Sequence, residues 1–147
     1  MSNERYELRE GLNAMTYEFS SIRPKGKIDK VVIYSEIDDN VYNLGFGDKN
    51  IDTGDIDDLV ITNNEDSQKV LATVASTVYV FLSKYPEALI IATGSTKART
   101  RLYQMGISKY LDEITADFNV FGEKDGKLHP FEKNIGYDAF LIMRKRK

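Results

Sequence analysis

The chain has 147 residues, of which 41% are hydrophobic and 29% are charged, and it contains no cysteine. This size and balance are typical of one globular domain with its own core, and the lack of cysteine excludes disulfides, thiolate metal sites and thiol catalysis. The net charge of −3 includes four basic residues at positions 144–147, so the remaining body is more acidic and its overall charge does not favour a nucleic-acid binder.

We expect neither secretion nor membrane insertion. Residues 1–7 lack the apolar centre of a signal peptide, and no apolar run approaches the roughly 20 residues that span a bilayer. We therefore expect a cytoplasmic protein that does not enter a membrane. We further expect residues 1–147 to form a single compact domain, with a mobile N-terminus at 1–12 and a mobile basic tail at 144–147.

The first third of the chain predicts a meander of three strands. Residues 15–22 and 30–36 have strand patterns, and a third strand at 41–47 follows a turn at 38–40. Two glycines near the end of this third strand leave the backbone without side-chain cover. They predict a hairpin whose end is bulged or is closely approached by another group. The apolar residues of the third strand that share one face are Tyr42, Leu44 and Phe46.

Two main helices are predicted in the middle of the chain. Apolar residues at helical spacing follow Asp66, which we expect to be the N-cap, and Pro86 stops this helix. The second helix is basic and should end at Gly106, since glycine is favoured just after a helix. Ser108 can then cap a further short helix over 109–113.

Further strands are predicted at residues 88–92, 114–121 and 137–143, with a turn at 123–126. We therefore expect an α+β fold, in which a mostly antiparallel sheet is covered by two main helices in the order β-β-β-α-β-α-β-β.

The most informative segment is residues 88–103, where a buried apolar strand turns into a helix with basic first turns. The free N–H groups and the macrodipole of a helix start favour an anion, and two cations four residues apart would reinforce it. The predicted ligand-binding residues are Gly94, Ser95, Thr96, Lys97, Arg99 and Arg101. Our leading hypothesis is a non-catalytic domain that binds an anionic or phosphate-bearing ligand, with nucleic acid as one such ligand.

A purely structural interpretation of the same segment is equally physical. Ser95 or Thr96 can simply cap the helix, and Arg99 and Arg101 can pair with nearby carboxylates. The candidate partners of the two arginines are Asp57, Asp58 and Glu113.

An acidic segment at residues 48–58 suggests a metal-dependent alternative. It is not an EF-hand, because counting from its first aspartate places Thr53 and Leu59 where glycine and glutamate are needed. A carboxylate site for magnesium would make a phosphoesterase or nuclease conceivable. Its candidate metal ligands are Asp48, Asp52, Asp57 and Asp58. No other cofactor is expected.

No complete catalytic signature stands in the chain, so we expect binding rather than catalysis. The single histidine, His129, is expected at a polar hairpin end and not in an active site. A third hypothesis is a protein-interaction module of a bacterial defence or toxin–antitoxin type, which would bind a protein partner through exposed apolar strand edges.

Four motifs resemble a family of small bacterial proteins of unknown function. The motifs are YNLGFGD at 42–48, the asparagine pair at 63–64, VLATVA at 70–75 and GSTKARTRLY at 94–103. The resemblance extends from about Tyr17 to Arg144 and implies a single compact cytoplasmic domain. The family's name carries no activity, so the resemblance implies no mechanism.

Overall fold

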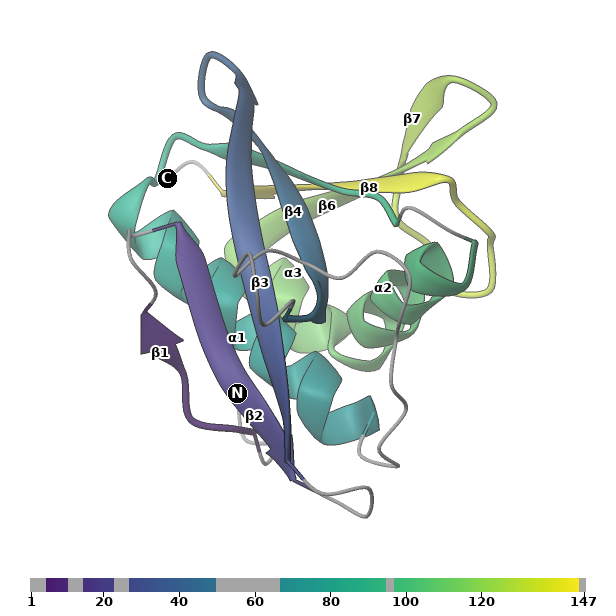
Figure 1. The fold of residues 1–147 in the computed structure, drawn as a ribbon. Coiled ribbons are helices and arrows are strands. Elements are labelled where there is room, and N and C mark those ends of the chain that lie inside the picture. Colours follow the sequence, from purple (N-terminus) through teal and green to yellow (C-terminus); the bar gives the residue numbers. More distant parts are fainter. Residues whose placement is uncertain (1–4, 11–14, 23–26, 50–66, 95–96, 146–147) are drawn as a thin grey trace.

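In the described part of the chain, three helices pack against one face of an eight-stranded sheet (Figure 1). The strand order is β1-β2-β3-β4-β5-β8-β6-β7, and every pair except β4 with β5 is antiparallel. The α+β class and the mostly antiparallel sheet are therefore confirmed. The computed structural model describes residues 5–10, 15–22, 27–49, 67–94 and 97–145.

The predicted meander is confirmed. Its strands are β2 (Thr16–Ile22), β3 (Lys27–Asp38) and β4 (Val41–Asp48). The irregularity lies at the turn end of the β3–β4 hairpin, between Glu36 and Asp38, and not at the glycine-containing end as we predicted. There the glycines of β4 continue a regular ladder with β3, because missing side chains leave backbone pairing intact.

A short edge strand, β1 (Arg9–Glu10), pairs with β2 and was not predicted. The backbone before β1 is attached to the core, since the Tyr6 N–H donates to Thr73 Oγ1 at 2.8 Å. The Tyr6 ring also stacks on Phe19, with 5.8 Å between the centroids. The segments 1–4 and 11–14 lie outside the described residues.

The first predicted helix is α1 (Ser67–Lys84), which connects β4 to β5 (Leu89–Ala92). This crossover makes β5 parallel to β4. The helix ends two residues before Pro86, as expected from the clash between proline and a preceding helical residue. The proposed N-cap, Asp66, lies outside the described residues.

The second helix is longer than predicted, because α2 (Lys97–Lys109) continues through Gly106. A β-carbon at Gly106 would lie 3.3 Å from Leu71 Cδ2. The glycine therefore marks a close approach of α2 to α1, and the predicted helix end at this position is wrong.

The short helix predicted at 109–113 is confirmed as α3 (Leu111–Asp117), but it begins later and extends over the first part of the strand predicted at 114–121. Ser108 lies inside α2 and does not cap α3, whose N-cap position makes no side-chain capping bond. Ile114 is buried three residues after the half-buried Leu111, so the apolar residues here follow helical and not strand spacing.

The C-terminal strands are β6 (Phe118–Lys124), β7 (Lys127–Pro130) and β8 (Ala139–Arg144). A two-residue turn joins β6 to β7, and both of its residues, Asp125 and Gly126, have positive φ, as the tight turns that match the strand twist require. β8 inserts between β5 and β6. The long strand pattern predicted at the end of the chain is confirmed in β8.

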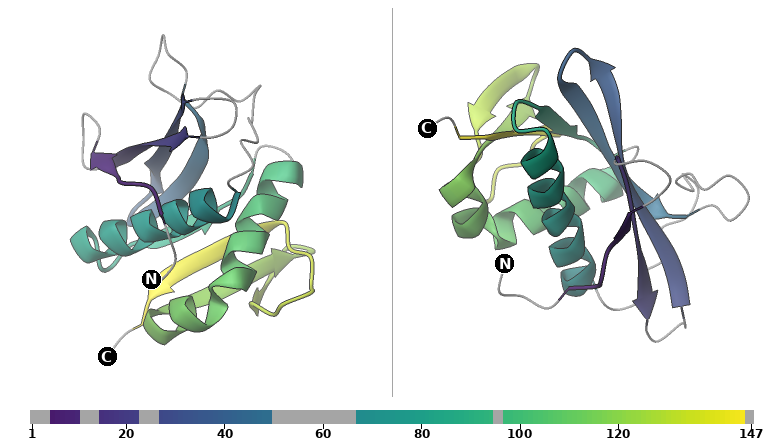
Figure 2. Two further views of the ribbon diagram at one scale, coloured as in Figure 1. Left: turned by 90° about the horizontal axis from the view of Figure 1, so that it is seen from below. Right: turned by 90° about the vertical axis from the view of Figure 1, so that its left-hand side faces the viewer.

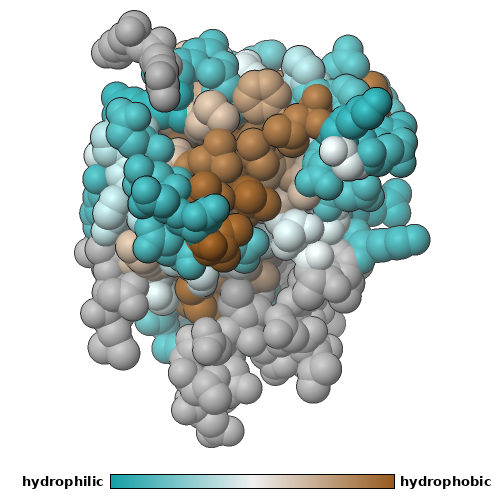
Figure 3. Space-filling model, turned by 90° about the horizontal axis from the view of Figure 1, so that it is seen from above, coloured by the Kyte–Doolittle hydropathy of each residue, from teal (hydrophilic) through white to brown (hydrophobic). Residues whose placement is uncertain are grey.

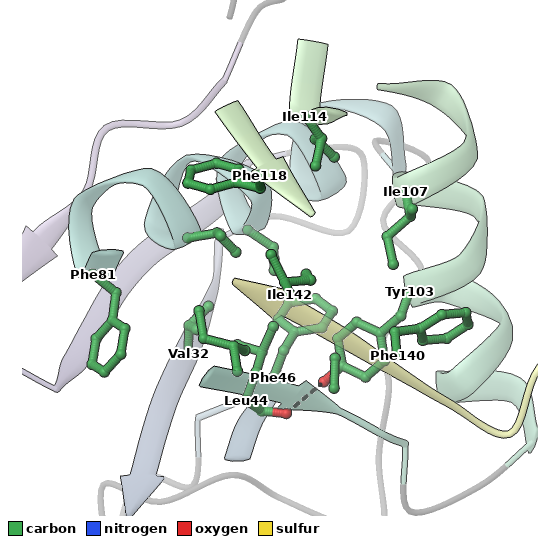
Figure 4. Packing of buried hydrophobic residues seen from close by; sticks show 14 of the residues in the cluster. Val32, Leu44, Phe46, Phe81, Tyr103, Ile107, Ile114, Phe118, Phe140 and Ile142 are labelled. Carbon is green, nitrogen blue, oxygen red and sulfur yellow. Dashed lines mark hydrogen bonds between the residues drawn. The ribbon is translucent and has the colours of Figure 1, made fainter. Parts of the chain in front are cut away.

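All three helices lie on one face of the sheet, and no described helix covers the other face (Figure 2). Side chains from α1, α2 and the inner face of the sheet form the core (Figure 4). The Tyr103 hydroxyl of α2 donates to the Leu44 carbonyl at 3.5 Å, and the Tyr34 and Phe81 rings stack at 4.1 Å. No helix in the described ranges has both the length and the apolar character needed to cross a bilayer.

Candidate anion-binding site

An open groove of about 1020 Å³ lies between α2 and the loop that leads into β8. Thr93 and Gly94, which follow β5, also line it. The loop contributes Asn134, Gly136, Tyr137 and Asp138 to the lining. The groove therefore contains part of the anion site predicted from the sequence.

One face of α2 supplies the basic groups of the groove. Lys97 and Arg101 are one turn apart, both are exposed, and both line the groove. Among the described residues, no carboxylate lies within 4.0 Å of either cationic group. Arg101 therefore makes no ion pair with Glu113, one of the partners that the structural interpretation suggested. The other two suggested partners, Asp57 and Asp58, lie outside the described residues.

Gly94 sits at the end of the groove, but its N–H is already used. It donates to the Thr100 Oγ1 at 3.1 Å, a bond that ties the strand end to the first turn of α2. Recognition of an anion here would thus fall to side chains more than to this amide. Ser95, Thr96 and the side chain of Arg99 lie outside the described residues.

Gln104 fixes the opposite wall of the groove, a role that the sequence analysis missed. Its amide nitrogen donates to the Ile135 carbonyl, and its amide oxygen accepts from the Tyr137 N–H at 3.4 Å. Gln104 lies seven residues after Lys97 and three after Arg101, so helical spacing alone could have placed it on the same face. Nothing in the sequence indicated the loop that it holds.

The Tyr137 side chain also holds this loop in place. Its hydroxyl accepts the Glu132 N–H at 3.0 Å and donates to the Pro130 carbonyl at 3.4 Å. Its ring occupies the space left open by Gly122 of β6, where a β-carbon would come within 2.3 Å of the ring. On the side of β5, the Thr93 hydroxyl donates to the Asp138 carbonyl at 3.2 Å.

The lining of the groove carries more positive than negative charge. It combines two cations with the hydroxyls of Thr93, Thr100 and Ser108, against the one carboxylate of Asp138. Such a set can bind an anion by charge and hydrogen bonds. The described lining holds no histidine and no pair of carboxylates, which are the usual groups for proton transfer.

The metal hypothesis draws no support from the residues that the structure describes. Asp48 is buried, and its Oδ1 lies 2.5 Å from Lys30 Nζ, so its carboxylate neutralises a buried ammonium. Asp52, Asp57 and Asp58 lie outside the described ranges. Within those ranges, no three metal-ligating side chains gather. His129 is exposed on β7 of the β6–β7 hairpin and does not line the groove.

Comparison with known proteins places this α+β domain in a family without assigning it an activity. The chain belongs to the family of unknown function DUF6934, which it matches over residues 2–145. This confirms the resemblance to a family of unknown function, which we described from about Tyr17 to Arg144. No match was found among curated proteins or among solved structures.

Proposed function

We propose that the protein is a non-catalytic domain that binds an anionic or phosphate-bearing ligand in the groove between α2 and the loop before β8. The observation that carries this proposal is the pair Lys97 and Arg101. Both side chains are exposed in the groove, and no described carboxylate lies within 4.0 Å of them.

The size of the groove favours a ligand larger than inorganic phosphate. Small-molecule sites usually enclose about 300–1,000 Å³, and this open groove, at about 1020 Å³, is just above that range. Beyond the two cations, its lining includes the half-buried hydroxyl of Ser108 and the exposed thioether of Met105. A ligand that joins a phosphate to a polar and an apolar part, such as a nucleotide or the end of a nucleic acid, matches this combination of groups.

Exposed charges set the expected strength and salt dependence of binding. Because both cations face solvent, their attraction to a phosphate is screened over a distance of about 8 Å at physiological ionic strength. Affinity should therefore fall as salt rises. Arg101 is expected to matter more than Lys97, because a guanidinium can donate two parallel hydrogen bonds to one phosphate.

The proposal is tested by titrating isotope-labelled protein with inorganic phosphate, nucleotides and short nucleic acids and following amide chemical shifts. We expect shifts to converge on Gly94, Lys97, Arg101 and Gln104. Arg101→Ala should weaken binding of the best ligand about tenfold, the loss of one or two charge-assisted hydrogen bonds. Lys124→Ala, which removes another exposed cation, from the β6–β7 hairpin, is the matched control and should bind normally. Unchanged affinity in Arg101→Ala would contradict the proposal.

A protein-interaction module is a second candidate function, favoured by the apolar surface on the helix-free face of the sheet. A partner captured there should be retained by Arg101→Ala, whereas a phosphate-bearing ligand should be weakened. The two functions are therefore separable with one variant.

A further inference from the structure

The helix-free face of the sheet is apolar at its centre. Along β5, β8 and β6, alternate residues are buried against the helices, and the residues between them point to the opposite face, where they are only partly buried. Figure 3 shows this face as a continuous hydrophobic band with hydrophilic clusters on either side. The apolar residues of these three strands on this face are Leu89, Ile91, Phe121, Leu141 and Met143.

Strand register joins these residues into one surface. Leu89 pairs with Met143, and Leu141 pairs with both Ile91 and Phe121. Directly paired residues lie side by side on the same face of a sheet, about 5 Å apart. The band is thus a property of the central strands, which are held firmly on both sides.

Neither edge of the described sheet offers an equivalent place for a partner. β1 has two residues, and the four residues of β7 include Lys127 and end in Pro130. Short edge strands, lysine and proline all disfavour the addition of another strand. A partner is therefore expected on the face and not at an edge.

Two hairpins border the face. The tips of the β3–β4 and β6–β7 hairpins extend beyond the central strands on opposite sides (Figure 1). Each carries an aliphatic residue that is mostly in solvent, Ile37 with 58% exposed and Leu128 with 54% exposed. The register of Leu128 with Glu123 places it on the same face as Phe121. The apolar surface therefore continues from the central strands onto at least one bordering hairpin.

Acidic residues lie on one side of β5 and basic residues on the other. The β3–β4 turn on one side is acidic, with Glu36, Asp38 and Asp39 all exposed. The end of β8 on the other side is basic, with Arg144 and Lys145 exposed. The ladder Asp38, Val41, Leu89, Met143 shows that the acidic turn and the basic end lie at the same end of the strands.

From this arrangement we infer that the helix-free face binds a second copy of the chain. The twofold axis lies in the interface between the two faces and runs parallel to β5. Rotation about that axis exchanges the β4 side of the face with the β8 side and keeps the ends of the strands in place. Each acidic turn then faces the basic end of the partner's β8, while the apolar bands of the two copies pack together. Self-complementarity of this kind is what a closed twofold dimer requires.

The apolar part of the inference is tested by sedimentation velocity over a concentration series from micromolar to millimolar. We expect the protein to dimerise, and Leu141→Lys to shift it to monomer, because a lysine there must desolvate its ammonium in the interface. Ile22→Lys is the matched control, since Ile22 is 59% exposed at the end of β2, a strand that β3 and β4 separate from β5. It should dimerise like the unmodified protein. Circular dichroism checks that both variants are folded.

The orientation is tested with charge reversals at two exposed positions that leave the core untouched. Asp39→Lys alone and Lys145→Glu alone should each weaken dimerisation about tenfold, because the twofold axis repeats every contact. The double variant should recover most of the affinity of the unmodified protein.

Three results would overturn the inference. A protein that stays monomeric throughout the series has no such interface, and a dimer that survives Leu141→Lys uses another surface. Failure of the double charge reversal to restore dimerisation would exclude the axis along β5. None of these results bears on the α2 groove, whose test is ligand binding and not mass.

Discussion

Lys30 and Asp48 show how a residue's surroundings decide between a structural and a catalytic interpretation. Both are buried, at 2% and 7% exposed, on neighbouring strands where β3 and β4 pair in register. The ammonium also lies 6.0 Å from the centroid of the Phe46 ring. As a sequence position, Asp48 was a candidate metal ligand. As a folded residue, it compensates a buried positive charge.

Asp48→Ala should therefore destabilise the fold by about 3–5 kcal/mol, the usual cost of leaving a buried charge without its partner. Urea unfolding of the variant measures this directly. The double variant Lys30→Met with Asp48→Leu removes both charges and should recover most of the lost stability. Equal stability of Asp48→Ala and the unmodified protein would show that the pair contributes little.

Tyr34 makes the stability of the protein depend on alkaline pH. Burial raises the pKa of the Tyr34 phenol well above its ordinary value of 10.0. The Thr77 hydroxyl donates to the Val74 carbonyl at 2.6 Å, so in its 2.8 Å contact with Tyr34 the phenol must be the donor. Ionisation would remove that donor inside the core.

The sign of the pH effect follows from proton binding. Below pH 10 the phenol is protonated in both the folded and the unfolded chain, whereas above it only the unfolded chain ionises, so stability must fall as pH rises. Burial also raises the pKa of Tyr42 and Tyr79, so they contribute in the same direction. In Tyr34→Phe, the unfolding free energy should fall less steeply with pH, because about one proton fewer is released on unfolding at alkaline pH. Thermal unfolding between pH 9 and 11 measures this slope. An unaltered slope would contradict this assignment.

At the scale of single residues, the sequence predicted what local spacing can reveal. Lys97 and Arg101 were expected on one helix face because they are four residues apart, and both line the groove. Gln104 and Asp138 were missed for different reasons. Gln104 obeyed the same spacing but carried no charge to draw attention to it. Asp138 comes from a loop whose position depends on contacts more than 30 residues away, such as that between Tyr137 and Gln104.

At the scale of elements, β6 and the loop before β8 pack closely together because Gly122 of β6 has no side chain. At Gly122, a β-carbon would come within 2.3 Å of the Tyr137 ring. The glycine thus leaves room for the Tyr137 ring, which holds the loop of residues 134–138 in place along the groove.

Gly122→Ala should displace Tyr137 and destabilise the protein by about 1–3 kcal/mol, as overpacking of a tight site usually does. The same change should broaden or shift the amide signals of residues 134–138 and weaken anion binding. Gly136→Ala is the control, since nothing lies within 4 Å of a β-carbon there and its stability should be nearly unchanged. If both variants were equally stable, Tyr137 would not depend on Gly122 for its position.

Element types were easier to predict than element ends. The period-2 patterns of β2 to β4 and the wide apolar face of α1 identified these elements, and Pro86 identified where α1 stops. Gly106 misled the prediction because a glycine can end a helix or admit a neighbouring helix, and the two are indistinguishable without the Leu71 contact. α3 was predicted only in part, as a short helix at 109–113, since its seven residues are too few to show a clear period.

For the whole molecule, pairing between distant strands was beyond prediction. Nothing local in β5 indicates that it lies between β4 and β8, about 50 residues away on each side. The α2 groove has the same origin, since it combines the end of β5 with α2 and the loop that leads into β8. The outer face of β5 and β8 also emerges only when the strands are assembled.

The place of β5 also determines when this sheet can be completed during protein synthesis. One side of this apolar strand can pair with β4 once residue 92 has left the ribosome, but its other side must wait for β8, which ends at Arg144. While the intervening residues are translated, the nascent chain carries an unpaired hydrophobic strand at the centre of its future sheet. Such a strand is where a ribosome-associated chaperone would be most useful, and where premature pairing between neighbouring nascent chains would begin.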